Sequence, residues 1–217
     1  VIGISGGIDS SVSSTLSAMT GLKTIAISMP IKQQSNQHDL SLKHQEWLKK
    51  NFTNVSGFTI ELDDLFKSFE TTLSKFNNEH GMANSRARLR MSTLYQVAAA
   101  NNGIVVGTGN KVEDFGVGFY TKYGDGGVDI SPIADCNKTE VWELGKELNI
   151  LKEIIEAQPT DGLWDDGRTD EGQLGLTYKE LEEAMNNENS INRDKYIKIR
   201  NANLHKMDPI PVCKIPK

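Results

Sequence analysis

The first eleven residues constrain this chain more than any other stretch of it. Val1 to Ile4 is a short apolar run, Ser5-Gly6-Gly7 follows it, and Asp9-Ser10-Ser11 then open a segment with helical spacing. An apolar run that is followed by glycines and then by a helical pattern is typical of a buried parallel strand turning sharply into a helix. The sequence therefore predicts an α/β unit at the very start of the chain.

The same turn has the features of an anion-binding site. Gly6 and Gly7 allow a ligand to approach the backbone closely, and Ser5 and Ser10 add hydroxyl donors. The N–H groups of the first helical turn have no partner inside the helix, and the helix dipole favours a negative charge there. Asp9 would be repelled by a bound phosphate unless a cation lay between them, so we interpret it as a Mg²⁺ ligand. A glycine-rich turn without a ligand is the alternative.

A second informative stretch is VGTGNKVE, which ends at Glu113. Gly103 to Gly107 (GIVVG) predicts a buried strand, and the polar turn after it delivers Thr108 and Glu113 to the carboxyl edge of the sheet. The first turn lies at the same kind of edge, where α/β proteins bind ligands. We therefore expect Asp9 and Glu113 to share one Mg²⁺ over the phosphates of a nucleotide. A solvated carboxylate at a helix start is the alternative for Glu113.

A third stretch, Gly118 to Asp129, reads GFYTKYGDGGVD and combines aromatic rings, a lysine, two aspartates and four glycines. This composition is poorly suited to a core element. It suits a ligand-binding loop, because flat rings stack on a base and glycines permit close approach. A surface turn is the alternative.

Strand-like and helix-like segments alternate along the chain. Further strands are predicted at 23–29 and 58–62, helices at about 38–50, 62–76, 83–101, 139–148, 151–157, 177–185 and 191–204, and a loop at 160–175. This alternation favours an α/β fold, a doubly wound parallel sheet with helices on both faces. We expect residues 1–217 to form a single domain. The chain starts inside a strand and without Met, so we interpret its N-terminus as truncated.

Composition disfavours several classes of protein. The chain has a net charge of -5, whereas nucleic-acid-binding domains are usually basic, so no nucleic-acid partner is expected. It has no apolar run of the roughly 20 residues that a membrane span needs, so no membrane partner is expected either. Cys136 and Cys213 lie far apart and form no CxxC pair. A zinc site or a disulfide framework is therefore not predicted, and a reducing cytoplasm fits.

The motif Ser-Gly-Gly-x-Asp-Ser is not the Walker pattern, because no Gly-Lys-Ser/Thr follows it. It resembles the pyrophosphate loop of the ATP pyrophosphatase group, whose members cleave ATP to AMP and pyrophosphate by adenylating a substrate oxygen. With this loop, the segments NSRARLRM, VVGTGNKVED, GFYTKYGDGGVDISP, PTDGLW…TDE and His205-Lys206 occur in the order and spacing of ammonia-dependent NAD synthetase. The run GFYTKYGDGG is the most diagnostic. The chain resembles that family from Val1 to about Lys206.

The resemblance implies both a fold and a reaction. The family fold is adenine nucleotide alpha hydrolase-like, in a cytoplasmic homodimer that binds deamido-NAD at the subunit interface. The implied reaction converts deamido-NAD, ATP and ammonia into NAD, AMP and pyrophosphate through an acyl adenylate. Mg²⁺ is the implied cofactor, and ATP is a co-substrate.

The resemblance also assigns roles to individual positions. ATP contacts are implied for Gly3, Ile4, Ser5, Gly6, Gly7, Ile8, Asp9, Ser10, Thr108, Lys138 and Thr160, and Mg²⁺ contacts for Asp9 and Glu113. Deamido-NAD contacts are implied for Arg88, Lys122, Asp129, His205 and Lys206. Asp9 and Lys138 are the expected catalytic residues, with Asp125 as our candidate for binding ammonium and taking its proton. Arg86 and Arg90 flank Arg88, which leaves open which arginine faces the site.

Two local features around Glu113 depart from the family pattern, and a third departure is the short, acidic segment from Trp164 to Gly172. Gly109-Asn110 stands where the family usually has Asp or Ser and then Asn or His, and one extra residue lies between Glu113 and GFYTKYGDGG. The runner-up functions are another pyrophosphate-loop amidotransferase, a tRNA-modifying enzyme, or a nucleotide-binding module without turnover. The acidic charge disfavours tRNA. Free ammonia is favoured as the nitrogen source, because nothing here supplies the amidase domain of glutamine-using relatives, and the residues before Val1 leave that point open.

Overall fold

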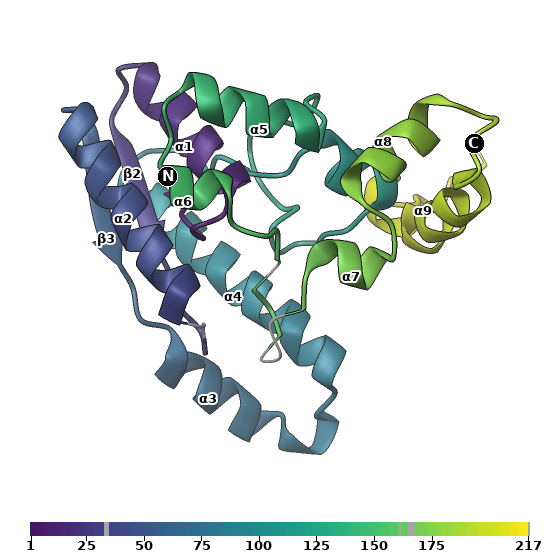
Figure 1. Ribbon diagram of the computed structural model, residues 1–217. Coiled ribbons are helices and arrows are strands. Elements are labelled where there is room, and N and C mark those ends of the chain that lie inside the picture. The colour runs from purple at the N-terminus through teal and green to yellow at the C-terminus, as the bar shows by residue number, and fades with distance from the viewer. Residues whose placement is uncertain (33–34, 161, 165–167, 217) are drawn as a thin grey trace.

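The computed structural model describes residues 1–32, 35–160, 162–164 and 168–216 (Figure 1). Its strands are β1 (Ile2–Gly3), β2 (Thr24–Ser28) and β3 (Val55–Thr59). Its helices are α1 (Ile8–Met19), α2 (Ser35–Asn51), α3 (Asp63–Thr72), α4 (Glu79–Ala100), α5 (Lys138–Glu147), α6 (Lys152–Ile155), α7 (Asp170–Leu174), α8 (Tyr178–Asn186) and α9 (Arg193–Met207), with a 3₁₀ turn η1 (Ser74–Phe76) and a π-helical segment η2 (Lys111–Val117). None of the helices in these ranges is long and apolar enough to cross a membrane.

The three strands form a parallel sheet in the order β1-β2-β3, with Ile2 opposite Ala26 and Thr24 opposite Val55. Two isolated parallel bridges, Ile2 to Val106 and Val106 to Ile130, continue the sheet on the other side of β1. The chain therefore winds outward from β1 in both directions. At the point where the direction of winding reverses, the loops after two neighbouring strands run to opposite sides of the sheet. They leave a crevice at the carboxyl ends of those strands. The turns after β1 and after Val106 flank that position.

Helices cover both faces of the sheet, as the packing of successive side chains of β2 shows. Ile25 and Ile27 pack in a buried cluster with Phe66 of α3 and Leu94 of α4. Ala26, between them, packs in a second cluster that includes residues of α1 and α2. Because successive side chains of a strand point to opposite faces, β2 is sandwiched between two helical layers. The predicted α/β fold with helices on both faces is confirmed.

The predicted strand at 103–107 is only partly formed. Val106 alone makes the bridges, whereas the N–H of Val105 donates to the Asp129 carboxylate at 2.7 Å. At Gly107, an added Cβ would lie 2.6 Å from a side-chain carbon of Val128. The side-chain acceptor at Val105 thus interrupts a ladder that Val106 and Gly107 continue, with backbone hydrogen bonds from their N–H groups to the carbonyls of Val1 and Ile130. Apolar β-prone residues predicted the extended conformation but not the identity of its hydrogen-bond partners.

Other boundaries also differ from the predictions: α4 begins at Glu79 instead of 83, and the helix predicted at 62–76 ends at Thr72, before η1. The third strand is Val55–Thr59 instead of 58–62, because these are the residues that pair with β2. It is an edge strand, and its Phe58 is 54% exposed. The stretch 160–175, predicted as a loop, contains the short helix α7, which Thr169 caps by accepting a hydrogen bond from the N–H of Gly172. Residues 161 and 165–167 of that stretch lie outside the described ranges.

A histidine holds α1 and α2 together. His44 is completely buried, its Nε2 lies 3.0 Å from Ser14 Oγ, and its ring stacks on Trp47. Burial lowers the pKa of His44 to about 4, although a hydrogen bond to the Ser11 backbone acts in the opposite direction. The ring is therefore neutral in the folded protein at pH 5, whereas the same side chain in the unfolded chain titrates near 6.5.

Stability should consequently fall as the pH drops from about 6.5 toward 4, because only the unfolded state takes up a proton there. From His44 alone we expect the free energy of unfolding to be about 2 kcal/mol lower at pH 5 than at pH 7. Urea unfolding at the two pH values measures this. In His44→Gln, which has no titrating ring, the pH-dependent loss should shrink by that amount, and an unchanged loss would contradict the assignment.

Candidate active site

The turn between β1 and α1 is held in shape by its own hydroxyl groups. Ser5 Oγ lies 3.0 Å from Ser10 Oγ, Ser10 Oγ donates to the Gly7 carbonyl at 3.0 Å, and the Gly7 N–H donates to Ser5 Oγ at 3.1 Å. Gly6 has a φ of +90°, and a Cβ there would lie 2.5 Å from the Gln37 carbonyl oxygen. Only glycine fits this position, because both the backbone conformation and the neighbouring backbone of α2 exclude a side chain.

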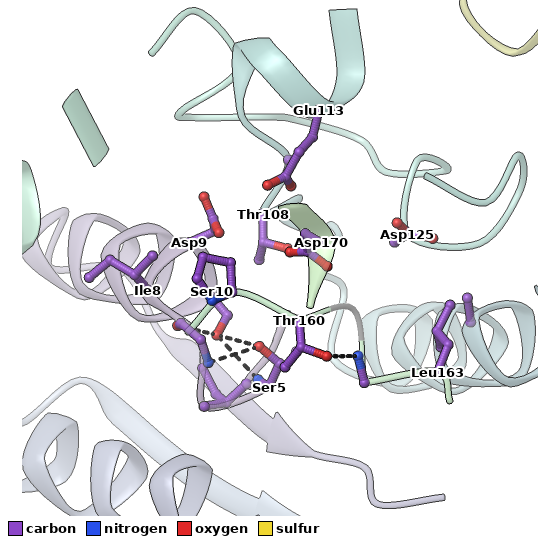
Figure 2. A pocket seen from close by; sticks show the side chains of 18 of the residues that line it. Ser5, Ile8, Asp9, Ser10, Thr108, Glu113, Asp125, Thr160, Leu163 and Asp170 are labelled. Atoms are coloured by element: carbon purple, nitrogen blue, oxygen red, sulfur yellow. Dashed lines mark hydrogen bonds between the residues drawn. The ribbon is translucent and has the colours of Figure 1, made fainter. Parts of the chain in front are cut away.

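A cavity of about 550 Å³ opens beside this turn, at the predicted reversal of the winding. The predicted nucleotide, metal and catalytic residues all line it: Gly3, Ile4, Ser5, Gly6, Gly7, Ile8, Asp9, Ser10, Thr108, Glu113, Asp125, Lys138 and Thr160. Figure 2 shows Asp9, Glu113 and Asp125 around one space, together with Asp170. Residues as far apart in the sequence as Gly3 and Thr160 thus line one site.

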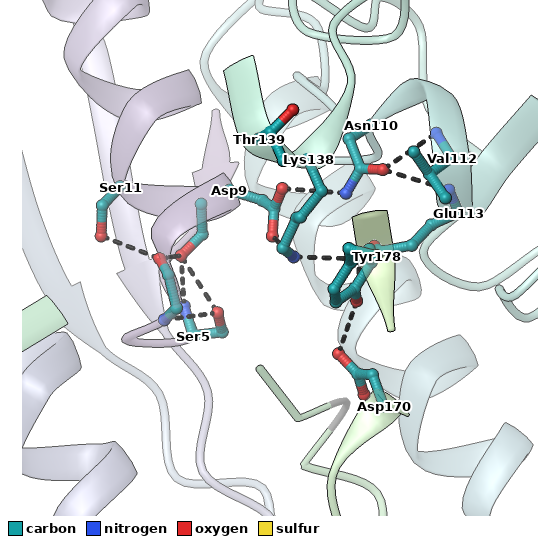
Figure 3. Close-up of polar contacts among 12 residues, drawn as sticks. Ser5, Asp9, Ser11, Asn110, Val112, Glu113, Lys138, Thr139, Asp170 and Tyr178 are labelled. Carbon is teal, nitrogen blue, oxygen red and sulfur yellow. Dashed lines mark hydrogen bonds and ion pairs between the residues drawn. The ribbon is translucent and has the colours of Figure 1, made fainter. Parts of the chain in front are cut away.

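Lys138, the first residue of α5, joins the two predicted metal ligands (Figure 3). Its Nζ lies 2.5 Å from Asp9 Oδ2 and 2.9 Å from Glu113 Oε1, and the side chain is 2% exposed. Asn110 completes the arrangement: its Nδ2 donates to Asp9 Oδ1 at 3.0 Å, and its Oδ1 caps η2 by accepting from the N–H groups of Val112 and Glu113. One lysine and one asparagine therefore fix the orientation of both carboxylates.

The charges in this cluster depend on one another. Burial alone would lower the pKa of Lys138, but the charges of Asp9 and Glu113 and their hydrogen bonds raise it, so the ammonium group is retained. Burial would raise the pKa of Glu113, but Lys138 and the Tyr178 hydroxyl hold it below its usual value. Burial raises the pKa of Asp9 in spite of Lys138, and the Glu113 charge adds to the increase. The cluster therefore keeps the Lys138 cation between two carboxyl groups, of which Glu113 has the lowered pKa and Asp9 the raised pKa.

The cavity as a whole is rich in carboxyl groups. Of the described residues that line it, five carry carboxyl groups and two are basic: Asp9, Glu113, Asp114, Asp125 and Asp170 against Arg90 and Lys138. A polyphosphate would be repelled here unless cations entered with it. Mg²⁺ prefers oxygen ligands and needs only one or two carboxylates besides phosphate oxygens. Asp9 and Glu113, which already converge on one cation, fit that requirement. The described residues hold no cluster of three or more metal-ligating side chains.

The two departures from the family pattern around Glu113, at Gly109 and at the extra residue after Glu113, have a local explanation. Asp114 Oδ2 would lie 1.9 Å from a Cβ at position 109, so only glycine leaves room for this carboxylate. The extra residue falls in or near η2, whose wider π-helical turn accommodates one more residue than an α-helical turn. Burial and the charges of Glu113 and Asp125 raise the pKa of Asp114 to about 8.

The residues predicted to bind deamido-NAD lie outside this cavity. Arg88 Nε donates to the Lys122 carbonyl at 3.2 Å, and Lys122 Nζ donates to the His205 carbonyl at 2.5 Å. Lys206 Nζ donates to the carbonyls of Gly118 and Tyr120, each at 2.8 Å. Four of the five therefore form one cluster where α4, the 118–123 segment and α9 meet.

The fifth predicted contact, Asp129, has structural partners. Its carboxylate accepts from the N–H of Val105 and from the Tyr95 hydroxyl, the latter at 3.1 Å. It therefore joins the 128–130 segment to α4 and to the residues before Gly107.

The three neighbouring arginines of α4 point to different places. Arg90 lines the cavity and donates from Nε to the Met29 carbonyl at 2.9 Å. Arg86 is 7% exposed, and its guanidinium donates to the Leu163 carbonyl at 3.1 Å and lies over the Phe66 ring. Arg88 belongs to the surface cluster. Helical spacing predicts that the three arginine side chains point in different directions, but it does not predict which of them faces the site.

Sequence reasoning missed three polar residues of the site. Asn110 was noticed only as a departure from the family, although an Asn before a helical segment is a capping signal. Asp170 belongs to the TDE motif but had no role. Tyr178 follows the capping residue Thr177 but had no predicted role; nothing in the sequence indicated that its hydroxyl reaches Glu113 at 2.5 Å.

These features define a class of protein: an α/β protein whose glycine-rich turn and lysine-bridged carboxylate pair face one cavity at the switch point of its sheet. The family model described as NAD synthase matches residues 1–211. The NH(3)-dependent NAD(+) synthetase of Carboxydothermus hydrogenoformans is 38% identical over 190 residues, 85% of this chain and 75% of that protein.

Two solved structures of enzymes also match almost the whole chain. NMN synthetase from Francisella tularensis matches with a TM-score of 0.90 and 34% identity, covering 99% of this chain and 88% of that one. NH3-dependent NAD synthetase from Campylobacter jejuni matches with a TM-score of 0.77 and 25% identity, covering 98% of this chain and 88% of that one. The chain belongs to the NAD synthase family and is an ATP-binding ligase that forms a carbon–nitrogen bond. The resemblance predicted from the motifs is confirmed.

Proposed function

We propose that this enzyme amidates deamido-NAD with ammonia, spending ATP and releasing NAD, AMP and pyrophosphate. The observation that carries the proposal is the single cavity in which the phosphate-binding turn, Lys138 and the Asp9–Glu113 pair meet, in a chain of the NAD synthase family. A phosphate turn without a Walker lysine suits attack at the α-phosphorus, with pyrophosphate as the leaving group.

Two chemical steps account for the products. A nicotinate carboxylate is a poor electrophile, so its oxygen first attacks the α-phosphorus of ATP, the bond to pyrophosphate breaks, and an acyl adenylate forms. The N–H groups at the start of α1, the hydroxyls of Ser5 and Ser10, and Lys138 stabilise charge on the pyrophosphate. Ammonia then attacks the activated carbonyl and AMP leaves. Thr108 and Thr160 complete the ATP contacts.

Mg²⁺ is the proposed cofactor, held by Asp9 and Glu113. When bound, it would neutralise charge on the phosphates and act as a Lewis acid. The number of carboxyl groups in the cavity supports this assignment, because ATP brings further negative charge to a site that has five carboxyl groups and two basic side chains among its described lining residues. Lys138 contacts both carboxylates and lines the cavity that would hold the phosphates.

Asp125 is the proposed ammonium site. Its carboxyl group lines the ATP cavity and a smaller neighbouring cavity of about 100 Å³, and accepts from the Thr121 N–H at 3.0 Å. Burial raises the pKa of Asp125 to about 6, in spite of hydrogen bonds from the backbone. An ionised carboxylate near this pKa both attracts ammonium and accepts its proton, which frees the nucleophilic amine.

One observation favours a second candidate substrate. The match to an NMN synthetase has a TM-score of 0.90, against 0.77 for an NH3-dependent NAD synthetase. Nicotinate mononucleotide has the same reacting carboxylate as deamido-NAD and would undergo the same two steps, giving nicotinamide mononucleotide. The two candidates differ only in the adenylate half, which the surface cluster of Arg88, Lys122, His205 and Lys206 would contact.

The direct test supplies ATP, ammonium and Mg²⁺ with either deamido-NAD or nicotinate mononucleotide. With either substrate we expect AMP, pyrophosphate and the amide product. We expect kcat/KM to be about 10-fold or more higher for deamido-NAD, since its extra adenylate half adds binding contacts.

Asp9→Asn should lower kcat about 100-fold, because it removes charge that acts on the transition state. Formation of ADP would contradict the mechanism, and a preference for the mononucleotide would select the second candidate.

Replacement of Asp125 by Asn should raise the KM for ammonium about 10-fold, because a hydrogen bond to a charged group is lost. The KM for ATP should stay within about 2-fold of wild type. The matched control is Asp135→Asn, which makes the same change at a side chain that is 98% exposed and outside both cavities. Equal effects in the two variants would remove Asp125 from the ammonium site.

A homodimer is the proposed assembly. Exposed apolar side chains lie beside the proposed deamido-NAD contacts: Tyr95, Ile104, Tyr123 and Ile130 are 38%, 51%, 63% and 48% exposed. Sedimentation equilibrium should give twice the chain mass of 24.0 kDa. Ile130→Glu should shift the protein toward monomer, whereas Leu22→Glu, at a 72% exposed position in the turn between α1 and β2, should not. A monomer in the wild-type protein would rule out the assembly.

A further inference from the structure

Tyr178 reaches the active site from within the core. It is the first residue of α8, its side chain is 1% exposed, and its ring packs edge-on against Trp142 with centroids 5.8 Å apart. The Lys138 ammonium lies 4.8 Å from the centre of the same ring. The hydroxyl, at the far end of the ring, lies 2.5 Å from Glu113 Oε1 and 3.1 Å from Asp170 Oδ2 (Figure 3).

A phenol has one hydrogen, so it donates fully to one carboxylate oxygen at a time. The distances assign that hydrogen to Glu113 in this arrangement. Glu113 Oε1 also accepts from Lys138 Nζ at 2.9 Å. The oxygen is thus held by two donors on two different elements, which fixes the direction in which the carboxylate faces.

The tyrosine is itself attached to α7 at two points. Its N–H donates to Glu171 Oε1 at 3.0 Å, and its hydroxyl contacts Asp170, the neighbouring residue of the same short helix. Thr169 and Asp170 of this segment line the cavity. The backbone and the hydroxyl of Tyr178 therefore both contact α7, so the position of the hydroxyl depends on the position of that helix.

We propose that Tyr178 is a positioning residue that orients the Glu113 carboxylate for Mg²⁺ and connects it to α7 through Asp170. The inference rests on the proposed function, because it concerns Glu113 as a metal ligand. Hydrogen-bond partners of metal-ligating groups fix ligand orientation, and their removal typically weakens metal binding or activity 10- to 100-fold. A residue that acted only in the core would not need a hydroxyl at this place.

The chain offers a matched control for this idea. Tyr196 is 5% exposed and belongs to the same buried cluster as Tyr178. It lies outside the residues that line the cavity. Tyr178→Phe and Tyr196→Phe therefore remove the same atom from two buried rings, one within reach of Glu113 and one remote from the cavity. Both variants keep the ring, including its contact with Lys138 in the case of Tyr178.

The experiment measures Mg²⁺ binding without turnover. An ATP analogue with a methylene group between the α- and β-phosphates is held at a fixed concentration, Mg²⁺ is titrated, and the thermal unfolding midpoint is followed. In Tyr178→Phe we expect the half-saturating Mg²⁺ concentration to rise about 10-fold, with the unliganded midpoint within about 4 °C of wild type. Tyr196→Phe should stay within about 2-fold of wild type.

Asp170→Asn completes a double-mutant cycle. If Asp170 acts through the hydroxyl, its substitution changes the half-saturating Mg²⁺ concentration by about 3-fold or more in the wild-type background and by less than about 2-fold beside Tyr178→Phe. If Tyr178→Phe does not fold, Asp170→Asn alone carries the test, and no change there overturns the inference. An unchanged value in Tyr178→Phe, or an equal change in Tyr196→Phe, also overturns it.

The result separates this inference from the proposed function. A wild-type protein whose midpoint does not respond to Mg²⁺ and the analogue would overturn the proposed function, and the inference with it. A normal response of the wild type, with no difference in the variants, would overturn the inference alone.

Discussion

The contact of one buried ammonium group with two carboxylates is the interaction on which the site depends. Lys138 is nearly inaccessible to solvent, and its partners Asp9 and Glu113 are 129 and 25 positions away in the chain. A buried charge without a partner is strongly destabilising, by about 3–5 kcal/mol, so the three residues must come together whenever the protein folds. The contact therefore joins α1, η2 and α5 and at the same time forms the chemical centre.

This electrostatic arrangement explains how an acidic protein handles a polyanionic substrate. The cavity has more carboxylates than basic groups, and the turn after β1 adds only neutral donors and a helix dipole. In the proposed function, the nucleotide therefore enters with cations, and the same carboxyl groups attract ammonium. Membership of the NAD synthase family and the charge of the site lead to one chemistry, carboxylate activation followed by attack of a small amine.

Much of the site was predictable because it is built on local patterns. The run from Ser5 to Ser10 forms its turn through contacts within six residues, and Gly6 has a conformation that the sequence itself signals. The extended segment before Gly107 was predictable as extended, but its partner was not, because Asp129 supplies a side-chain acceptor from a distant loop. The direction of each arginine on α4 was likewise undetermined, because neighbours on a helix differ by about 100° and only packing decides which side is buried.

The sequence by itself determined the winding of the sheet, the phosphate turn and the family, because each depends on residue types at short and fixed spacing. The tertiary structure alone decided that Lys138 lies between Asp9 and Glu113, that Asn110 orients both, and that the Tyr178 hydroxyl reaches the same carboxylate. These contacts join residues that are far apart in the chain. Their geometry depends on how whole helices pack, and no local pattern of residues encodes it.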